Sequence, residues 1–230
     1  MNPHNRTTPS REVEIPTEKV VLHGTLTVPG AAPGIVLFAH GSGSSRLSPR
    51  NQAVARELQQ GGLATLLFDL LAAEEEAIDA RTGHLRFDID LLADRLVHAT
   101  EWVSRQAELS DLTIGYFGAS TGAGAALVAA ARLPGLVSVV VSRGGRPDLA
   151  GMALPKVKAP TLLIVGGRDL PVIEMNREAL AVLTVEKKLE IVPGATHLFE
   201  EPGTLEEVAR LAREWFIRFL VRPAAEATSR

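Results

Sequence analysis

Three residues of the types used for nucleophilic catalysis, Ser120, Asp169 and His197, each follow a short apolar run of the chain. A serine hydroxyl becomes a nucleophile when an imidazole takes its proton, and a carboxylate can hold that imidazole in the required orientation. Because the three residues lie far apart in the sequence, the elements that carry them must bring them to one place.

The serine lies in a motif with small residues on both sides. Residues 118–122 read Gly-Ala-Ser-Thr-Gly, between the apolar run 113–117 and an alanine-rich segment, 121–132. The G-x-S-x-G pattern is typical of a sharp turn from a strand into a helix, where a side chain at either flank would collide with the backbone. The motif alone also fits a small-residue turn that packs a helix on a sheet. We predict that Ser120 is the nucleophile and that the amide of Thr121 stabilises an oxyanion.

The acid and the base are predicted from their positions after two later apolar runs. Residues 161–165 precede Asp169, and residues 189–193 precede His197. Continuous apolar runs of this length are typical of parallel strands that are buried on both faces. Ligands bind at the carboxyl edge of such sheets, so both side chains should face one crevice. A loop cap for Asp169 and an ordinary surface position for His197 are the simpler alternatives.

The order Ser, Asp, His resembles that of the α/β-hydrolase superfamily, and in particular its compact, lidless, dienelactone-hydrolase-like branch. The strand-like run 35–39, followed by His-Gly-Ser-Gly-Ser-Ser at 40–45, adds to the resemblance, which covers about residues 12–220. It implies a mostly parallel sheet of about eight strands, helices on both faces and no lid domain. Dienelactone hydrolase itself uses a cysteine nucleophile. This chain contains no cysteine, so the resemblance implies a serine nucleophile and leaves the substrate open.

The same resemblance gives the loop after residue 39 a role in oxyanion binding. It implies that the second N–H donor is that of Ser42, with Gly43 as the neighbouring alternative. His40 and Gly43 are further candidates for contact with the substrate. A phosphate-binding loop is disfavoured, because Arg46 stands where the third glycine of such a motif would be.

The segment after residues 137–142 is too short for an inserted lid, so we expect an open pocket that suits short esters. Arg143 and Arg146 begin this segment. The simplest role for them is an ion pair with Glu200 or Glu201, and the alternative is contact with an acidic group of the substrate.

The remaining pattern alternates between strands and helices, as expected for a parallel sheet with helices on both faces. An antiparallel pair is expected to open the fold. The predicted strands are 11–15, 20–28, 35–39, 64–68, 113–117, 137–142, 161–165 and 188–192. The predicted helices are 49–60, 89–106, 121–132, 176–183 and 205–220. We expect residues 70–86 to be a loop in which Glu74, Glu75 and Glu76 face solvent.

Length and composition predict one catalytic domain at residues 11–221, with mobile tails at 1–10 and 222–230. A net charge of −3 and an aromatic content of 4% argue against a nucleic-acid surface. No apolar run reaches the roughly 18 residues that a membrane span needs. We therefore expect a cytoplasmic protein that binds a small-molecule ester and has no nucleic-acid or membrane partner, no cofactor and no metal.

These residues predict a carboxylesterase-like serine hydrolase that cleaves small carboxylic esters through an acyl-enzyme. Two alternatives stay open. The first is another acyl transfer at the same serine, as in a thioesterase or a peptidase. The second is a noncatalytic binding module that keeps the fold, because a fold alone does not establish activity.

Overall fold

The computed structural model describes residues 9–221 of the chain. Of the two predicted tails, residues 1–8 and 222–230 lie outside this range, and Ser10 already belongs to the first strand. Within the described residues, no helix has the length and apolar character needed to cross a membrane.

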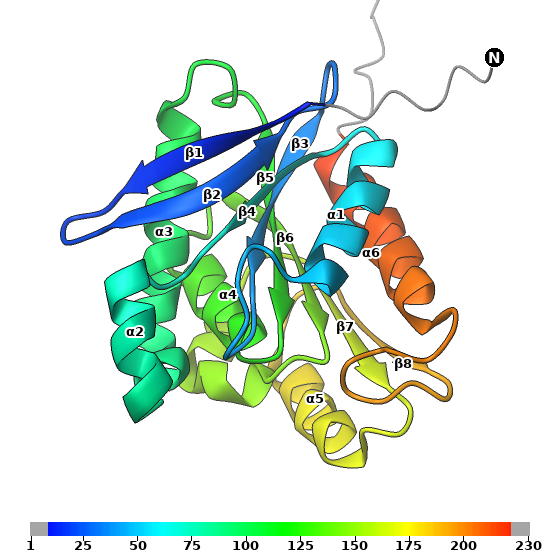
Figure 1. Ribbon diagram of the computed structural model, residues 1–230. Helices are drawn as coiled ribbons and strands as arrows, with labels where there is room; N and C mark the ends of the chain where they lie inside the picture. Colours follow the sequence, from blue (N-terminus) through cyan, green and yellow to red (C-terminus); the bar gives the residue numbers. More distant parts are fainter. Residues whose placement is uncertain (1–8, 222–230) are drawn as a thin grey trace, which may run out of the picture.

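Eight strands form one twisted sheet in the order β1-β2-β4-β3-β5-β6-β7-β8 (Figure 1). The first two strands pair antiparallel, β2 runs antiparallel to β4, and all the other pairs are parallel. The strands are β1 (Ser10–Pro16), β2 (Val21–Thr27), β3 (Gly34–Ala39), β4 (Ala64–Phe68), β5 (Thr113–Ala119), β6 (Val137–Arg143), β7 (Thr161–Gly166) and β8 (Lys187–Val192).

Helices cover both faces of this sheet. The helical elements are α1 (Pro49–Gln60), α2 (Ala73–Thr82), η1 (Leu85–Phe87), α3 (Ile89–Arg105), α4 (Thr121–Arg132), η2 (Pro147–Lys156), α5 (Leu170–Val182) and α6 (Thr204–Leu220). One apolar cluster joins α1 and α6 to the sheet. A second cluster packs α3, α4 and η2 against the opposite face, so the sheet is the middle of three layers (Figure 1). This is the α/β-hydrolase architecture that the resemblance implies.

Burial explains why the central strands were predictable. Every residue of β3 and of β7 is buried, as expected for parallel strands that are covered by helices on both faces. The edge strand β8 differs, because Lys187 and Lys188 are exposed on it. Charged residues at a sheet edge discourage pairing with another chain.

Two of the predicted elements were wrong. Residues 70–86 are not a loop, because α2 and η1 lie within them. The helix predicted from residue 176 begins at Leu170, with Pro171 in its first turn. Proline is well tolerated there, since the first N–H groups of a helix have no partner within the helix.

Polar contacts hold α2 in place. The carboxylate of Glu75 accepts a hydrogen bond from the N–H of Ala72 and forms a 2.6 Å ion pair with the buried side chain of Arg95 on α3. Gly83 ends the helix in the left-handed conformation, with φ of 68°. Glu75 therefore does not simply face solvent, whereas Glu74 and Glu76 are exposed.

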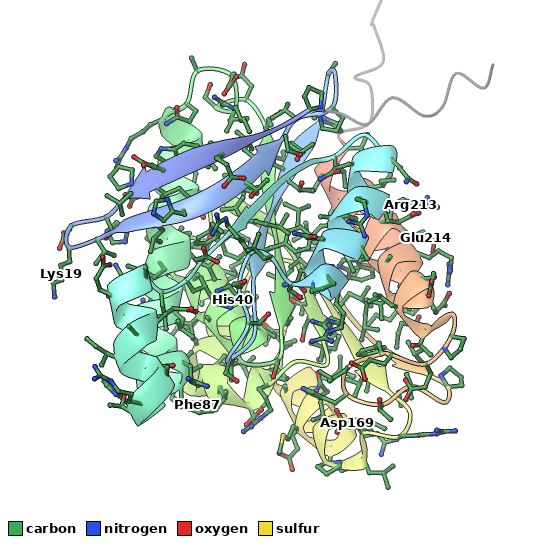
Figure 2. All side chains as sticks on the ribbon, in the orientation of Figure 1. Lys19, His40, Phe87, Asp169, Arg213 and Glu214 are labelled. Carbon is green, nitrogen blue, oxygen red and sulfur yellow. The ribbon has the colours of Figure 1, made fainter. Side chains whose placement is uncertain are left out.

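The parallel strands place their carboxyl ends along one edge of the sheet. Ser120 follows β5, Arg143 ends β6 and Asp169 comes shortly after β7. Figure 2 labels His40, which follows β3, and Asp169 near the arrowhead ends of the strands. The residues singled out by sequence therefore come to one edge, although many residues separate them along the chain.

Candidate active site

Ser120 lies at a strained turn between β5 and α4. Its backbone has φ of 50° and ψ of −122°, a conformation that residues other than glycine rarely adopt. A Cβ atom at Gly118 would lie 2.5 Å from the Cα atom of Ala123, and one at Gly122 would lie 2.5 Å from the carbonyl oxygen of His40. Both flanking residues must therefore be glycine, and the sharp turn leaves the serine partly exposed at the helix N-terminus.

Asp169 and His197 are in direct contact. The Oδ2 atom of Asp169 lies 2.6 Å from the Nδ1 atom of His197. Asp169 occupies the N-cap position of α5, yet its side chain caps no backbone N–H of the helix. Its side chain is 14% exposed and that of His197 is 39% exposed. A carboxylate in this position fixes the imidazole so that its Nε2 atom is the one left to take a proton.

Gly144 connects the serine to this pair. The N–H of Ser120 donates to the carbonyl oxygen of Arg143 at 3.2 Å. A Cβ atom at the next residue, Gly144, would lie 3.6 Å from the Cε1 atom of His197. The hydrogen bonds among residues 9–221 include none between the Ser120 hydroxyl and His197. The main chain of Ser120 thus bonds to Arg143, and His197 lies against the next residue, Gly144. Catalytic hydrogen bonds are often long or poorly aligned in substrate-free enzymes.

The loop after β3 lies against the serine. A Cβ atom at Gly41 would lie 3.1 Å from the Cβ atom of Ser120. The N–H of Ser42 donates to the side-chain hydroxyl of Thr121 at 2.9 Å. Gly43 follows with φ of 69°, in the left-handed region that favours glycine. The structure therefore brings the two predicted oxyanion residues, Ser42 and Thr121, into contact beside the predicted nucleophile.

His40 is buried and bonded to the backbone on both sides. Its Nε2 atom accepts from the N–H of Leu70 at 3.0 Å, so its Nδ1 atom carries the proton and donates to the carbonyl of Gly41, also at 3.0 Å. Burial lowers the pKa of His40 from 6.5 and outweighs the opposing effects of the Gly41 carbonyl and of the charges on Asp69 and Glu76. His40 is thus a neutral residue that ties the loop to the segment after β4.

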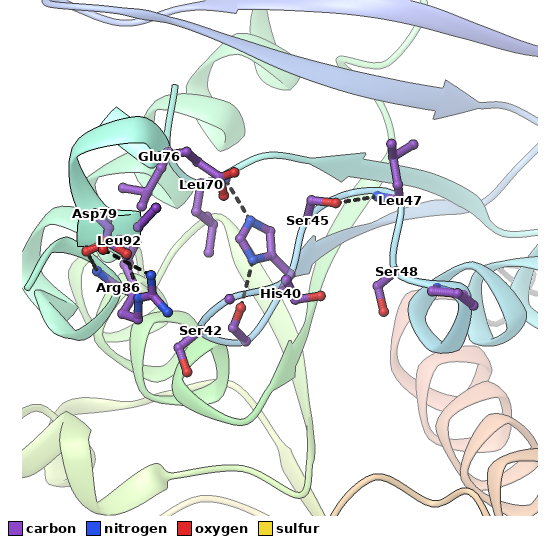
Figure 3. A pocket seen from close by; sticks show the side chains of 16 residues that line it. His40, Ser42, Ser45, Leu47, Ser48, Leu70, Glu76, Asp79, Arg86 and Leu92 are labelled. Atoms are coloured by element: carbon purple, nitrogen blue, oxygen red, sulfur yellow. Dashed lines mark hydrogen bonds and ion pairs between the residues drawn. The ribbon is translucent and has the colours of Figure 1, made fainter. Parts of the chain in front are cut away.

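A cavity of about 440 Å³ separates this loop from α2 (Figure 3). In Figure 3 His40 lies in its middle, with Asp79 and Arg86 on one side and Ser48 on the other. Its apolar wall consists of Leu47, Leu70, Leu71, Ala80 and Leu92. The loop residues that border the nucleophile line the cavity, whereas the three triad candidates do not. The space therefore adjoins the predicted catalytic residues without containing them.

The sequence analysis missed the charged residues of this cavity. Arg86 donates through Nε to the buried carboxylate of Asp79 at 2.6 Å, and Asp79 also accepts from the N–H of Leu85 at 2.7 Å. The acidic first turn at Glu74 and the helix-ending Gly83 are the signals that would have revealed α2 and with it this pair. In the described part of the chain, no three His, Asp or Glu side chains form a group that could hold a metal ion.

The predicted ion pairs of the two arginines after β6 were wrong. Arg146 pairs instead with Asp148, at 2.7 Å, and the partner of Glu200 is Arg50. Arg143 is 7% exposed and donates to the amide oxygen of Asn51 at 3.3 Å. Burial and the nearby charge of Arg50 lower the pKa of Arg143 to about 10. Its side chain is thus packed inside the protein beside α1.

Sequence comparison agrees with this architecture. Residues 22–220 match the dienelactone hydrolase family. The chain belongs to this family. Membership makes the protein an α/β hydrolase, as the order of its motifs predicted. A dienelactone hydrolase from Anabaena variabilis, known from its crystal structure, is 62% identical, with a TM-score of 0.92, and the match covers 94% of this chain and 100% of that chain.

Curated relatives carry a different name. Two Mycobacterium tuberculosis proteins, each called "Putative phosphoribosyl transferase", are 59% identical to this family member over 212 residues. The match covers 92% of this chain and 47% of each relative, so the chain spans about half the length of the curated relatives it matches.

A more distant structure shares the fold. Est1E from Butyrivibrio proteoclasticus, in a complex with ferulic acid, is 17% identical, with a TM-score of 0.76. The match covers 91% of this chain and 100% of that chain. At this level of identity the similarity concerns the fold alone.

Proposed function

We propose that the protein is a carboxylesterase-like serine hydrolase that cleaves small carboxylic esters through an acyl-enzyme. The observation that carries this proposal is the 2.6 Å contact between Asp169 and His197 beside the strained turn of Ser120. Membership of the dienelactone hydrolase family supports the reaction class. The chain contains no cysteine, which supports serine rather than cysteine as the proposed nucleophile.

In the proposed first step, the Nε2 atom of His197 takes the hydroxyl proton of Ser120 as the Oγ atom attacks the ester carbonyl carbon. The carbonyl oxygen becomes an oxyanion beside the N–H of Thr121 and the loop that contains Ser42. Asp169 remains ionised and stabilises the imidazolium. The ester bond breaks, and the alcohol oxygen leaves with the proton that His197 returns.

In the second step, water replaces the alcohol. His197 takes a proton from the water molecule, whose oxygen attacks the acyl carbon. When the new tetrahedral intermediate collapses, the bond to the Ser120 oxygen breaks and that oxygen recovers its proton from His197. The products are a carboxylic acid and the original enzyme, so the cycle needs no redox partner.

The cavity between the loop after β3 and α2 is the proposed site for the acyl group. It adjoins Ser42, and its apolar wall includes Leu70, Leu71 and Leu92. The wall can remove a few methylene groups from water, each worth about 0.8 kcal/mol. Few apolar side chains form this wall, so we expect it to favour small esters over long acyl chains.

The test of this proposal is labelling with a fluorophosphonate together with turnover of p-nitrophenyl acetate. We expect the probe to attach to Ser120, and Ser120→Ala to lower kcat by about 10⁴-fold or more, since triad residues act as a unit. Ser110→Ala is the matched control, because Ser110 is exposed and its hydroxyl contacts only Ala107. Labelling at another serine, or a Ser120→Ala variant with a tenth of the original activity, contradicts the proposal.

The same experiment separates the alternatives. A thioesterase would label at Ser120 and prefer a thioester such as S-phenyl thioacetate over phenyl acetate. A noncatalytic binding module would neither label nor turn over any ester. The name of the mycobacterial relatives describes phosphoribosyl transfer, and we favour hydrolysis for this chain because acyl transfer is the chemistry that its serine turn and Asp–His pair support.

A further inference from the structure

The N–H of Ser42 already has a partner inside the protein. It donates to the Oγ1 atom of Thr121 at 2.9 Å, and Thr121 is only 2% exposed. A direct role for Ser42 in binding an oxyanion would require this bond to break. In this arrangement of the described residues, the hydroxyl of Thr121, and not the N–H of Ser42, is the group that is free to donate.

The hydroxyl of Thr121 retains an unused proton. A hydroxyl group has one donor and two acceptor sites, and the bond from Ser42 uses an acceptor site. Among residues 9–221, no acceptor takes the hydroxyl proton of Thr121. A buried donor normally has a partner, so an unpaired donor beside a candidate nucleophile points to a ligand atom that is bound there.

The position of Thr121 suits two donations to one atom. It is the first residue of α4, so its main-chain N–H has no partner within the helix. The hydroxyl is attached to the same residue and can reach the same neighbouring atom. Ser42 fixes the hydroxyl oxygen from the other side, and its neighbour Gly41 lies against Ser120. These contacts gather Gly41, Ser42 and Thr121 around Ser120.

We infer that Thr121 donates twice to the oxyanion, through its main-chain N–H and its side-chain hydroxyl, while the N–H of Ser42 orients that hydroxyl. Ser42 is then a positioning residue, and Thr121 is a catalytic residue. The inference rests on the proposed ester hydrolysis. The hydroxyl proton stays on Thr121 throughout, so no bond forms or breaks beyond those already described.

Charge development explains why the hydroxyl would assist catalysis. A hydroxyl donating to an anionic oxygen forms a shorter and stronger bond than one donating to a neutral carbonyl. The bond from Ser42 polarises the hydroxyl and makes it a better donor. Its effect should therefore appear in kcat more than in KM, since the charge exists only in the transition state. Removal of one oxyanion donor typically costs about 10² to 10³ in kcat.

The test compares Thr121→Val with Thr121→Ser in the full chain, using p-nitrophenyl acetate. Valine keeps the shape and the N–H but lacks the hydroxyl, whereas serine keeps both donors. We expect Thr121→Val to lower kcat by about 10²-fold with KM within about threefold, and Thr121→Ser to stay within about threefold in both. Thr161→Val is the matched control, since Thr161 is a buried threonine at the start of β7.

A second measurement uses phenylboronic acid, which forms a tetrahedral adduct with a catalytic serine. Its affinity should fall in Thr121→Val by a factor close to the loss in kcat, and should persist in Thr121→Ser. Thr121→Ala is a second variant without the hydroxyl, and thermal unfolding identifies any variant that does not fold. This parallel loss would not follow from a purely structural role.

Three outcomes overturn the inference. A Thr121→Val variant as fast as the original protein shows that the hydroxyl takes no part. A faster variant shows that the hydroxyl blocks Ser42 and that Ser42 is the direct donor. Equal losses in the valine and serine variants show that packing is responsible. If the original protein neither labels at Ser120 nor hydrolyses esters, the proposed function itself fails. If it does both and Thr121→Val is unaffected, only this inference fails.

Discussion

The Oδ2 atom of Asp169 lies 2.6 Å from the Nδ1 atom of His197, although the two residues are 28 positions apart in the chain. A second carboxylate that follows a strand, Asp148 after β6, instead accepts hydrogen bonds of 2.9 and 2.7 Å from Arg146. Only one of the two carboxylates is thus in a position to orient the imidazole. Mutation of each carboxylate should therefore have a different effect on catalysis.

Asp169→Asn should lower kcat on p-nitrophenyl acetate by about 10³ to 10⁴, because asparagine stabilises the wrong tautomer of His197. Asp148→Asn is the matched control and should keep kcat within about threefold. Steady-state kinetics of the two purified variants provides the measurement. A larger loss of kcat in Asp148→Asn than in Asp169→Asn would show that Asp169 is not the acid.

Gly122→Ala should destabilise the protein although alanine is the better helix former. The new methyl group would collide with the carbonyl oxygens of Ala39 and His40. We expect the free energy of unfolding to fall by about 2 to 3 kcal/mol, the usual cost of an overpacked interior, as measured by urea unfolding. Gly135→Ala is the control, since no heavy atom lies within 4 Å of the added position, and its effect should stay within about 0.5 kcal/mol. Equal stability of the two variants would show that the turn can relax.

The buried strands could be predicted from sequence because helices cover both their faces. Such strands must be almost entirely apolar, as residues 35–39 and 162–165 are. The helix α2 could not be found in the same way. Its one large apolar residue, Ile78, is exposed, and its only buried residue is Asp79. Its position depends on polar contacts with distant residues such as Arg95, which no local periodicity reveals.

Part of the candidate site could be predicted from the sequence, and part could not. Asp169 and His197 could be placed because residues after parallel strands meet at one edge of a sheet. The bond from Ser42 to Thr121 joins residues 79 positions apart and involves a side-chain hydroxyl. Its formation depends on how closely α4 approaches the loop after β3, which in turn depends on the absence of a side chain at Gly122. The sequence alone does not reveal how closely these two segments pack, so this hydrogen bond could not be predicted from it.

His40 should make the stability of the protein depend on pH. Burial lowers the pKa of folded His40 below its ordinary value of 6.5, so the unfolded chain takes up the proton first as the pH falls. The contribution of His40 is therefore complete above about pH 6.5 and is lost on acidification, by at most about 1.4 kcal/mol per pH unit. Urea unfolding between pH 5 and 7.5 measures this loss.

His40→Gln is the comparison, because glutamine keeps a donor and an acceptor but does not titrate. The variant should be less stable than the original protein at pH 7.5, and the difference should shrink toward pH 5. The other histidines are the same in both proteins, so their titration cancels in the comparison. Parallel stability curves, or a difference that grows on acidification, would show that folded His40 is not kept neutral by burial.

The length of the acyl chain should be limited by the cavity beside α2. With p-nitrophenyl esters, we expect kcat/KM for acetate or butyrate to exceed that for decanoate by at least about tenfold, because the few apolar side chains that line the cavity can remove only part of the longer chain from water. The Ala80→Phe variant fills this space from α2. It should lower kcat/KM for hexanoate relative to acetate by about tenfold, since the loss of two buried methylene groups costs about 1.6 kcal/mol.

Ala77→Phe is the matched control for this substitution. Ala77 is an exposed alanine on the same helix and does not line the cavity, so its variant should keep the chain-length profile of the original protein. If kcat/KM rises steadily to decanoate, the long chain has an apolar surface outside this cavity. If Ala80→Phe changes the preference for the alcohol group while the acyl profile stays the same, the cavity holds the leaving group. Either result would place the acyl chain on the other side of Ser120, toward the segment that follows β6.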